Sequence, residues 1–443
     1  MRKPVLPRIV FQCFLYFMIF LVIIIIQFSG TSERPGFADR RRTFDPGEFV
    51  IPEAAAGQDF AAMVSGWHSE NYSIWSRQIA QQNNEDLVIS FIAEALSRAN
   101  YRAAISAIPA SFLNGNQRAF ESAVFLGHTE QASRMLAASD REKLSLVSGL
   151  IETNSPDLLN ERSVFNFLHT RGHTDLMARA AELIASLDPE TIRMSHVPGI
   201  FEGYMEWNSF NSPIENPFGR LIERACALIS ISLRMNSEKS RVFVIYDEDL
   251  QEGNLTEGNL INTEYNLLLA GALLNWAEHQ ANENWAALAR SIILSVLSLE
   301  NQGSISAGFI FSPENEIIEN PQGPRLLTAY ISRMLGLGDY KPKAVPLGTP
   351  NNVWALTLDQ TINASMQNNI LNISVSFPPG ESHYMIIRGI RPFEKIQIYG
   401  LDYPSDPQFE RYDSSGWRYL PAEATLLVKM RHRSVTENIL IYY

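Results

Sequence analysis

The first pattern along the chain is an unbroken apolar run over residues 9–28, in which only Gln12 and Gln27 are strongly polar. At 1.5 Å of rise per residue, a helix of this length spans about 30 Å, the thickness of a bilayer's hydrocarbon core. Phe28 stands where a signal-peptide cleavage site needs a small residue, which favours an uncleaved anchor. The run therefore predicts a transmembrane helix surrounded by membrane lipid.

Residues 58–235 are predicted to be dominantly helical, because their apolar positions recur at roughly helical spacing. Two segments that start Gly-His-Thr, at Gly127 and Gly172, lie 45 residues apart, a spacing that suits stacked helical hairpins. Further along, one apolar stripe contains Trp276 and the next contains Trp285. Because only the short connector HQANEN separates these stripes, they predict an antiparallel helical hairpin with both tryptophans buried.

The pattern changes after residue 350, where short runs rich in β-branched and aromatic residues alternate with turn signals such as Pro378-Pro379-Gly380. Six or seven strands in about ninety residues are typical of an antiparallel β-sandwich. The Gly- and Pro-rich stretch 336–350 is predicted as a linker. The predicted segments are a cytoplasmic tail (1–8), the anchor (9–28), a stalk (29–57), a helical domain (58–345) and a β-sandwich (351–443).

Composition and charge restrict the function more than the fold. A formal net charge of -12 argues against nucleic acid as a partner, because such proteins need a basic face. The two cysteines, Cys13 and Cys226, both lie in apolar stretches and form neither a disulfide framework nor a paired-Cys metal site. No phosphate-binding, dinucleotide or Gly-x-Ser-x-Gly motif occurs, so no cofactor is predicted. The short N-terminal tail favours an orientation with the bulk of the chain outside the cytoplasm, on the periplasmic or cell-envelope side.

Two groups of residues are candidates for catalysis. Asp247 and Asp249 follow the predicted strand 241–246, and glycoside hydrolysis uses one carboxylate as acid and another as base or nucleophile. His196 and Glu206 lie among aromatic residues, a combination that suits sugar stacking and proton transfer. The alternatives are a solvated acidic loop for the first group and a packed helix corner for the second, and the sequence favours these alternatives.

Two further groups are candidates for binding. Lys429, Arg431 and Arg433 alternate along a predicted strand, so their side chains share one face, which suits an anionic glycan or lipid head group. A solvated outer face is the alternative. His169 and His173 are four residues apart, but the sequence offers too few nearby ligands for zinc, so no metal site is predicted.

Two resemblances to known families accompany these patterns. The Trp-bearing hairpin between Asn266 and Leu299 resembles the repeats of α/α-toroid proteins, which include exported glycan hydrolases and lyases, some with a β-sandwich behind the toroid. The anchor together with residues 27–37 resembles uncharacterised exported proteins of spirochaetes. Neither resemblance includes a catalytic motif, so no residue's role is carried over.

The predicted fold class is multidomain α+β. It combines a single N-terminal transmembrane helix, an α-helical domain of stacked hairpins or α/α-toroid type, and a C-terminal antiparallel β-sandwich. The architecture and the missing catalytic signatures favour a non-enzymatic, membrane-anchored envelope protein that binds a glycan or a protein partner. A membrane-anchored glycan hydrolase or lyase is the alternative. A concave acidic and aromatic pocket would favour the enzyme, and a broad exposed face would favour the binding protein.

Overall fold

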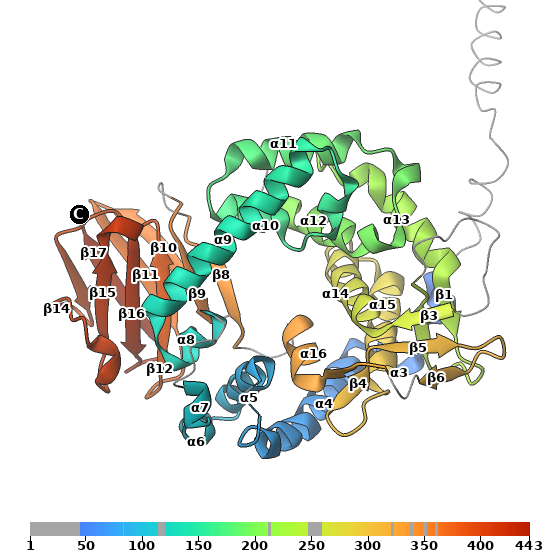
Figure 1. Cartoon of the computed structure of the whole chain (residues 1–443), viewed down its shortest axis with the longest axis horizontal. Helices are drawn as coiled ribbons and strands as arrows, with labels where there is room; N and C mark the ends of the chain where they lie inside the picture. Colours follow the sequence, from blue (N-terminus) through green and yellow to red (C-terminus); the bar gives the residue numbers. More distant parts are fainter. Residues whose placement is uncertain are drawn as a thin grey trace, which may run out of the picture. The chain divides into compact units, whose positions relative to one another are not determined.

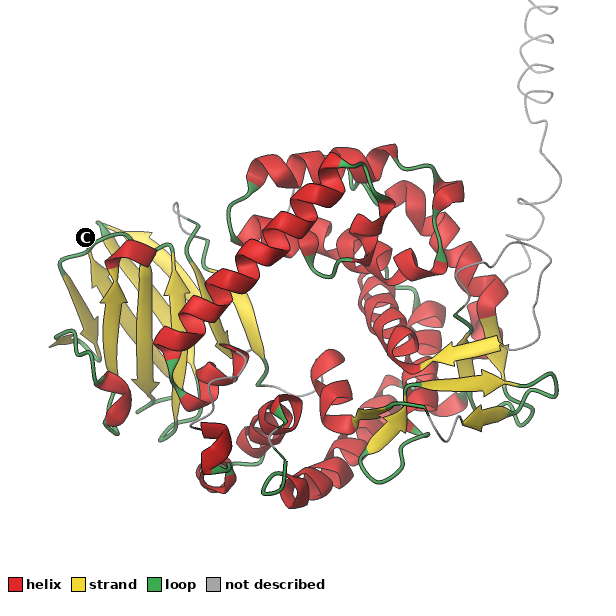
Figure 2. Cartoon of the chain, in the orientation of Figure 1, coloured by secondary structure: helices red, strands yellow, loops and turns green. Residues whose placement is uncertain are grey.

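In the computed structural model, the segments with helical spacing of apolar residues form helices, and the later segments with alternating apolar residues form strands. The structure describes residues 45–82, 84–113, 120–210, 214–246, 259–319, 323–336, 340–348, 352–358 and 362–443. Residues 46–443 form one compact unit. Its N-terminal half is mainly helical and its C-terminal half is rich in strands (Figure 1, Figure 2). The structure therefore shows an α+β fold.

The described α-helices follow one another from residue 52 to residue 334. They are α3 (Pro52–Ala55), α4 (Gly57–Gln78), α5 (Glu85–Ser97), α6 (Tyr101–Ala107), α7 (Ala110–Leu113), α8 (Ala123–Leu126), α9 (Thr129–Glu152), α10 (Val164–Thr170), α11 (Thr174–Ser186), α12 (Val197–Ser209), α13 (Gly219–Ser232), α14 (Thr263–His279), α15 (Glu283–Leu297) and α16 (Thr328–Met334).

The predicted fold class needs one correction, because it included a single transmembrane helix at residues 9–28. Those residues lie outside the part of the chain that the structure describes. Within the described part, no helix combines the length and the apolar composition needed to cross a bilayer. The longest described helices, α4 and α9, each carry several charged side chains. The corrected fold class is α+β with a helical N-terminal half and a β-rich C-terminal half, and the description as a single-pass membrane protein is dropped.

The predicted helical hairpin is confirmed as α14 and α15, and both of its tryptophans are buried. The side-chain oxygen of Asn262 caps α14 by accepting the N–H of Tyr265 at 2.9 Å. Asn282 caps α15 in the same way, through the N–H of Trp285 at 3.4 Å. Trp276 and Trp285 pack edge to face across the turn, with ring centroids 6.3 Å apart.

Within the described residues, seven short strands lie among the later helices and form three small antiparallel sheets. β1 (Leu233–Met235) pairs with β2 (Val242–Val244), and β4 (Ser304–Ser306) pairs with β7 (Arg325–Leu327). The third sheet has the order β3-β5-β6, formed by β3 (Asn259–Asn262), β5 (Gly308–Phe311) and β6 (Ile317–Glu319).

The last part of the chain, from β8 to β17, forms an antiparallel β-sandwich of two described five-stranded sheets, with the orders β10-β11-β17-β13-β14 and β15-β16-β12-β9-β8. The strands are β8 (Pro342–Pro346), β9 (Trp354–Leu358), β10 (Ile362–Gln367), β11 (Ile370–Ser376), β12 (Ser382–Arg388), β13 (Lys395–Ile398), β14 (Leu401–Tyr403), β15 (Gly416–Leu420), β16 (Thr425–Arg431) and β17 (Thr436–Tyr442). The predicted linker contributes β8, an edge strand of the second sheet. The limits of the predicted domains stay predictions.

The second sheet is buried on both faces. One face, with Ala355 and Val428, contributes to the apolar core between the two sheets. The other face, with Leu356 and Leu427, belongs to an apolar cluster that includes Phe125 of α8 and reaches α4 and α5. Double burial explains why β9 and β16 read as nearly continuous apolar runs, whereas β11 in the first sheet alternates.

Two histidines are buried where this sheet meets the helices, one on β12 and one directly after β16. His383 and His432 are each about 1% exposed, and their ring centroids lie 5.2 Å apart. Phe377 packs on both rings, at 4.4 Å from His383 and 5.4 Å from His432. Burial lowers the pKa of both imidazoles, that of His432 to about 4. At His432 a backbone hydrogen bond with Ser434 and the Glu437 carboxylate only partly offset the effect of burial. Both rings are therefore neutral in the folded protein at pH 7.

We predict that the folded protein loses stability as the pH falls from about 6.5 toward 4. In this pH window the imidazole of His432 is protonated in the unfolded chain and neutral in the folded protein, so acid favours unfolding. A shift from the ordinary 6.5 to about 4 corresponds to roughly 3 kcal/mol at the acidic end of the window. Urea unfolding at pH 7, 6, 5 and 4.5 should show a shallower loss for His432→Leu than for the wild type. The exposed-site variant His279→Gln is the control, and equal slopes in wild type and His432→Leu would contradict the prediction.

Candidate functional site

The structure describes two of the four predicted catalytic residues, His196 and Glu206, and it does not bring these two together. Asp247 and Asp249 lie outside the described residues. His196 precedes α12 and is buried, its Nδ1 accepting the N–H of Arg193 at 3.2 Å and its Nε2 lying 3.5 Å from a carboxylate oxygen of Asp157. Glu206 lies near the other end of α12, about 15 Å away along the helix axis. No acid and base therefore face each other across a common cleft at these two positions.

The pKa of the Glu206 carboxyl group is raised, and its surroundings in the fold explain why. Burial raises its pKa to about 7, and the neighbouring carboxylate of Glu202 adds to the effect. Its charged form is held by the N–H of Asn166 at 3.1 Å. The adjoining pocket, which Glu202 and Ser163 also line, has room for at most one water molecule. A sugar ring does not fit there, so the geometry supports a packed helix corner.

The three predicted cationic side chains each contact other groups of the protein. Lys429 is buried, and its ammonium donates to the carbonyl oxygens of Tyr412 at 2.5 Å and Glu410 at 3.3 Å. Arg431 pairs with the side chain of Asp413 at 2.9 Å. Arg433 lies beyond the end of β16, where its guanidinium stacks on the ring of Tyr399 at 4.2 Å. The expected row of cations on one strand face is not assembled.

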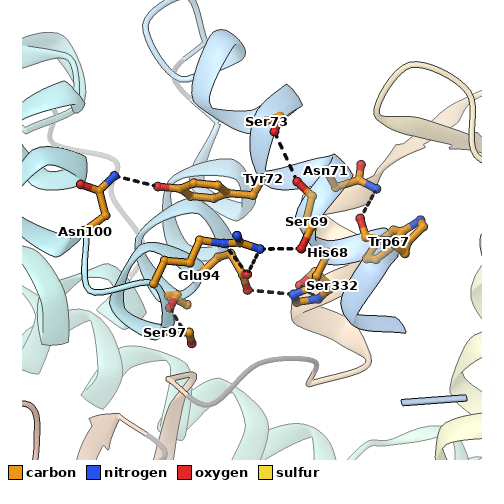
Figure 3. Close-up of polar contacts among 12 residues, drawn as sticks. Trp67, His68, Ser69, Asn71, Tyr72, Ser73, Glu94, Ser97, Asn100 and Ser332 are labelled. Carbon is orange, nitrogen blue, oxygen red and sulfur yellow. Dashed lines mark hydrogen bonds and ion pairs between the residues drawn. The ribbon is translucent and has the colours of Figure 1, made fainter. Parts of the chain in front are cut away.

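A polar chain that no sequence motif indicated joins α4, α5 and α16. His68 Nδ1 lies 2.9 Å from Glu94 Oε2, and His68 Nε2 lies 3.1 Å from the hydroxyl of Ser332 (Figure 3). Arg98 holds the other carboxylate oxygen of Glu94 at 2.7 Å. The hydrogen bonds to His68 and Arg98 lower the pKa of Glu94 against the opposing effect of burial, so its carboxylate is charged at neutral pH.

This order of serine, histidine and carboxylate is that of a serine hydrolase triad, in which the imidazole removes the hydroxyl proton and the carboxylate orients the ring. No sequence pattern could indicate this arrangement, because His68 and Ser332 are 264 positions apart. Only the packing of three helices brings these side chains together.

Two observations on the described residues nevertheless argue against catalysis at Ser332. An oxyanion hole needs hydrogen-bond donors that point at the substrate, and the backbone N–H of the nucleophile is often one of them. Ser332 is the fifth residue of α16, so the helix already uses its N–H. The hydroxyl is also inaccessible, because Ser332 is 3% exposed and the pocket that it lines with His68 has room for about one water molecule. As described, the chain Arg98–Glu94–His68–Ser332 is a satisfied polar link between helices.

The described surface carries one feature that the fold does not need. Nine large apolar side chains are exposed in the described part, and three of them form a single row across β3, β5 and β6. Leu260 lies directly opposite Ile310, and Ile310 lies opposite Ile318. Their exposed fractions are 44%, 44% and 51%. We refer to Leu260, Ile310 and Ile318 as the apolar row.

No protein-family model and no curated protein matches this chain. The resemblances to α/α-toroid proteins and to exported spirochaete proteins therefore stay predictions. Any functional assignment has to come from the geometry of the chain itself.

We predict that Ser332 does not react with a fluorophosphonate probe, and that Ser332→Ala lowers the free energy of unfolding by about 1–3 kcal/mol. The loss follows because the variant leaves a buried imidazole nitrogen without its partner. Intact-mass spectrometry after probe treatment and urea unfolding are the two measurements. Ser90→Ala is the matched control, since Ser90 is also buried and bonds the carbonyl of Ala329 in α16 at 2.7 Å. Labelling at Ser332 that Glu94→Gln abolishes would instead establish a hydrolase.

Proposed function

We propose that this protein acts by binding another polypeptide rather than by catalysis, and that the apolar row is part of the binding surface. The observation that carries the proposal is the alignment of Leu260, Ile310 and Ile318. Exposed apolar side chains are ordinary when they are scattered singly. Three in direct cross-strand register form a continuous surface that water solvates poorly, and a partner's side chains would cover it.

The size of the pockets supports binding over glycan turnover. Small-molecule sites commonly enclose about 300–1,000 Å³. The pockets beside Glu206 and beside Ser332 each hold no more than about one water molecule. The carboxylate of Glu206 accepts the backbone N–H of Asn166, as expected for a packed helix corner. The envelope location and an envelope partner stay predictions.

Ester hydrolysis is the second candidate function, favoured by the triad-like chain of Glu94, His68 and Ser332. It requires Ser332 to become accessible through a change in the packing of α16. The probe-labelling experiment described above separates this function from polypeptide binding, because only an activated and accessible serine forms the covalent adduct.

We predict that a photo-crosslinking residue at the apolar row captures one defined protein in the cells that produce this chain. p-Benzoylphenylalanine at position 310 or at position 318 should yield the same partner, identified by mass spectrometry. The same residue at Leu401, which is exposed on the β-sandwich, is the control.

The additional change Leu260→Glu should reduce the crosslink at position 310 several-fold, because it places a charge next to the buried contact. Circular dichroism would verify that this exposed-site variant remains folded. The same crosslinked products at positions 310 and 401, or insensitivity to Leu260→Glu, would contradict the proposal.

A further inference from the structure

The sheet β3-β5-β6 has one face anchored in the protein and one face exposed. Ile261, Phe309 and Phe311 point inward and are at most 3% exposed. The apolar row occupies the other face, as the alternation of a strand requires. A fixed backbone therefore presents the row, and a partner binds it without first ordering the sheet.

The row ends at an open edge of the sheet. In the order β3-β5-β6, β6 is the terminal strand, and no described strand pairs with its outer side (Figure 1). Edge strands present a line of backbone N–H and C=O groups that pair readily with another extended segment. The next position in the row after Ile318 would then belong to a strand added beside β6.

Carboxylates surround this edge. Glu316 is exposed and immediately precedes β6, two residues before Ile318. Glu314 and Glu319 are exposed on the same β5–β6 hairpin. Arg325 pairs with Glu319, whereas no ion pair involves Glu314 or Glu316 within the described residues. The edge is thus apolar at its centre and acidic around it.

We propose that the partner adds one extended strand antiparallel to β6, with an apolar residue opposite Ile318 and a lysine or arginine opposite Glu316. This inference rests on the proposed function and names the chemistry of the partner. A second copy of this chain is the less suitable occupant, because it would bring three more carboxylates to the same edge and like charges oppose pairing.

Synthetic peptides test the proposal directly. The probe is fluorescein-labelled Thr-Val-Thr-Val-Thr-Lys-Thr, whose central valine faces the row and whose lysine meets Glu316 in the antiparallel register. One control peptide has glutamate in place of lysine. The other carries N-methyl groups on the residues whose N–H groups face β6, which removes the backbone bonds and keeps the side chains.

Fluorescence polarisation should show binding of the lysine peptide, at least about fivefold weaker binding of the glutamate peptide, and no binding of the N-methylated peptide. The exposed-site variant Glu316→Lys should reverse the preference between the first two peptides. Ile318→Glu should abolish binding of the lysine peptide, with its fold verified by circular dichroism.

Absence of binding by the lysine peptide, or the same preference in wild type and Glu316→Lys, would overturn the strand-addition proposal. A failure of the strand-addition proposal can be told apart from a failure of the proposed function. Row-dependent crosslinking without peptide binding would leave polypeptide binding in place and reject the added strand. Concentration-dependent dimerisation of the wild type that Ile318→Glu removes would identify a second copy as the occupant and would also reject the proposal.

Discussion

The double burial of the sheet β15-β16-β12-β9-β8 is the constraint on which most of this structure depends. Its inner face completes the core of the sandwich, and its outer face completes the apolar cluster of the helices. Leu356 and Ala355 are neighbours on β9, yet their side chains belong to different cores. Neither half buries its apolar surface alone, which is why residues 46–443 form one compact unit.

A boundary of this kind has to satisfy every charge that it covers, because an unpaired buried charge costs several kcal/mol. The carboxylate of Glu410 accepts the N–H groups of His128 and Thr129 at the start of α9, at 2.9 Å each. Arg171 stacks on the ring of Trp354 at 3.7 Å and pairs with Asp140 at 3.1 Å. Lys429 belongs to the same system through the carbonyl of Glu410. A cation that looks available on a strand is here a structural partner.

Local patterns made the elements predictable, and long-range contacts made the sites unpredictable. The hairpin around Trp276 and Trp285 follows from spacing and length alone, and the strands of the sandwich follow from short β-rich runs. β8 was missed because its two prolines resemble a linker, although an edge strand tolerates them. The apolar row depends on the register of three strands, and the link from His68 to Ser332 depends on helix packing. Neither is encoded in any local stretch of sequence.

The polar link and the apolar row illustrate how burial separates a structural contact from an accessible surface. A charged carboxylate at Glu94 needs strong partners once helices cover it, and Arg98 with His68 supplies them. A catalytic triad orients its imidazole by the same physics, so hydrogen-bond distances alone do not separate the two cases. Access separates them, because a nucleophile has to meet substrate. Ser332 is enclosed, whereas Ile318 lies exposed on β6, the terminal strand of its sheet among the described residues.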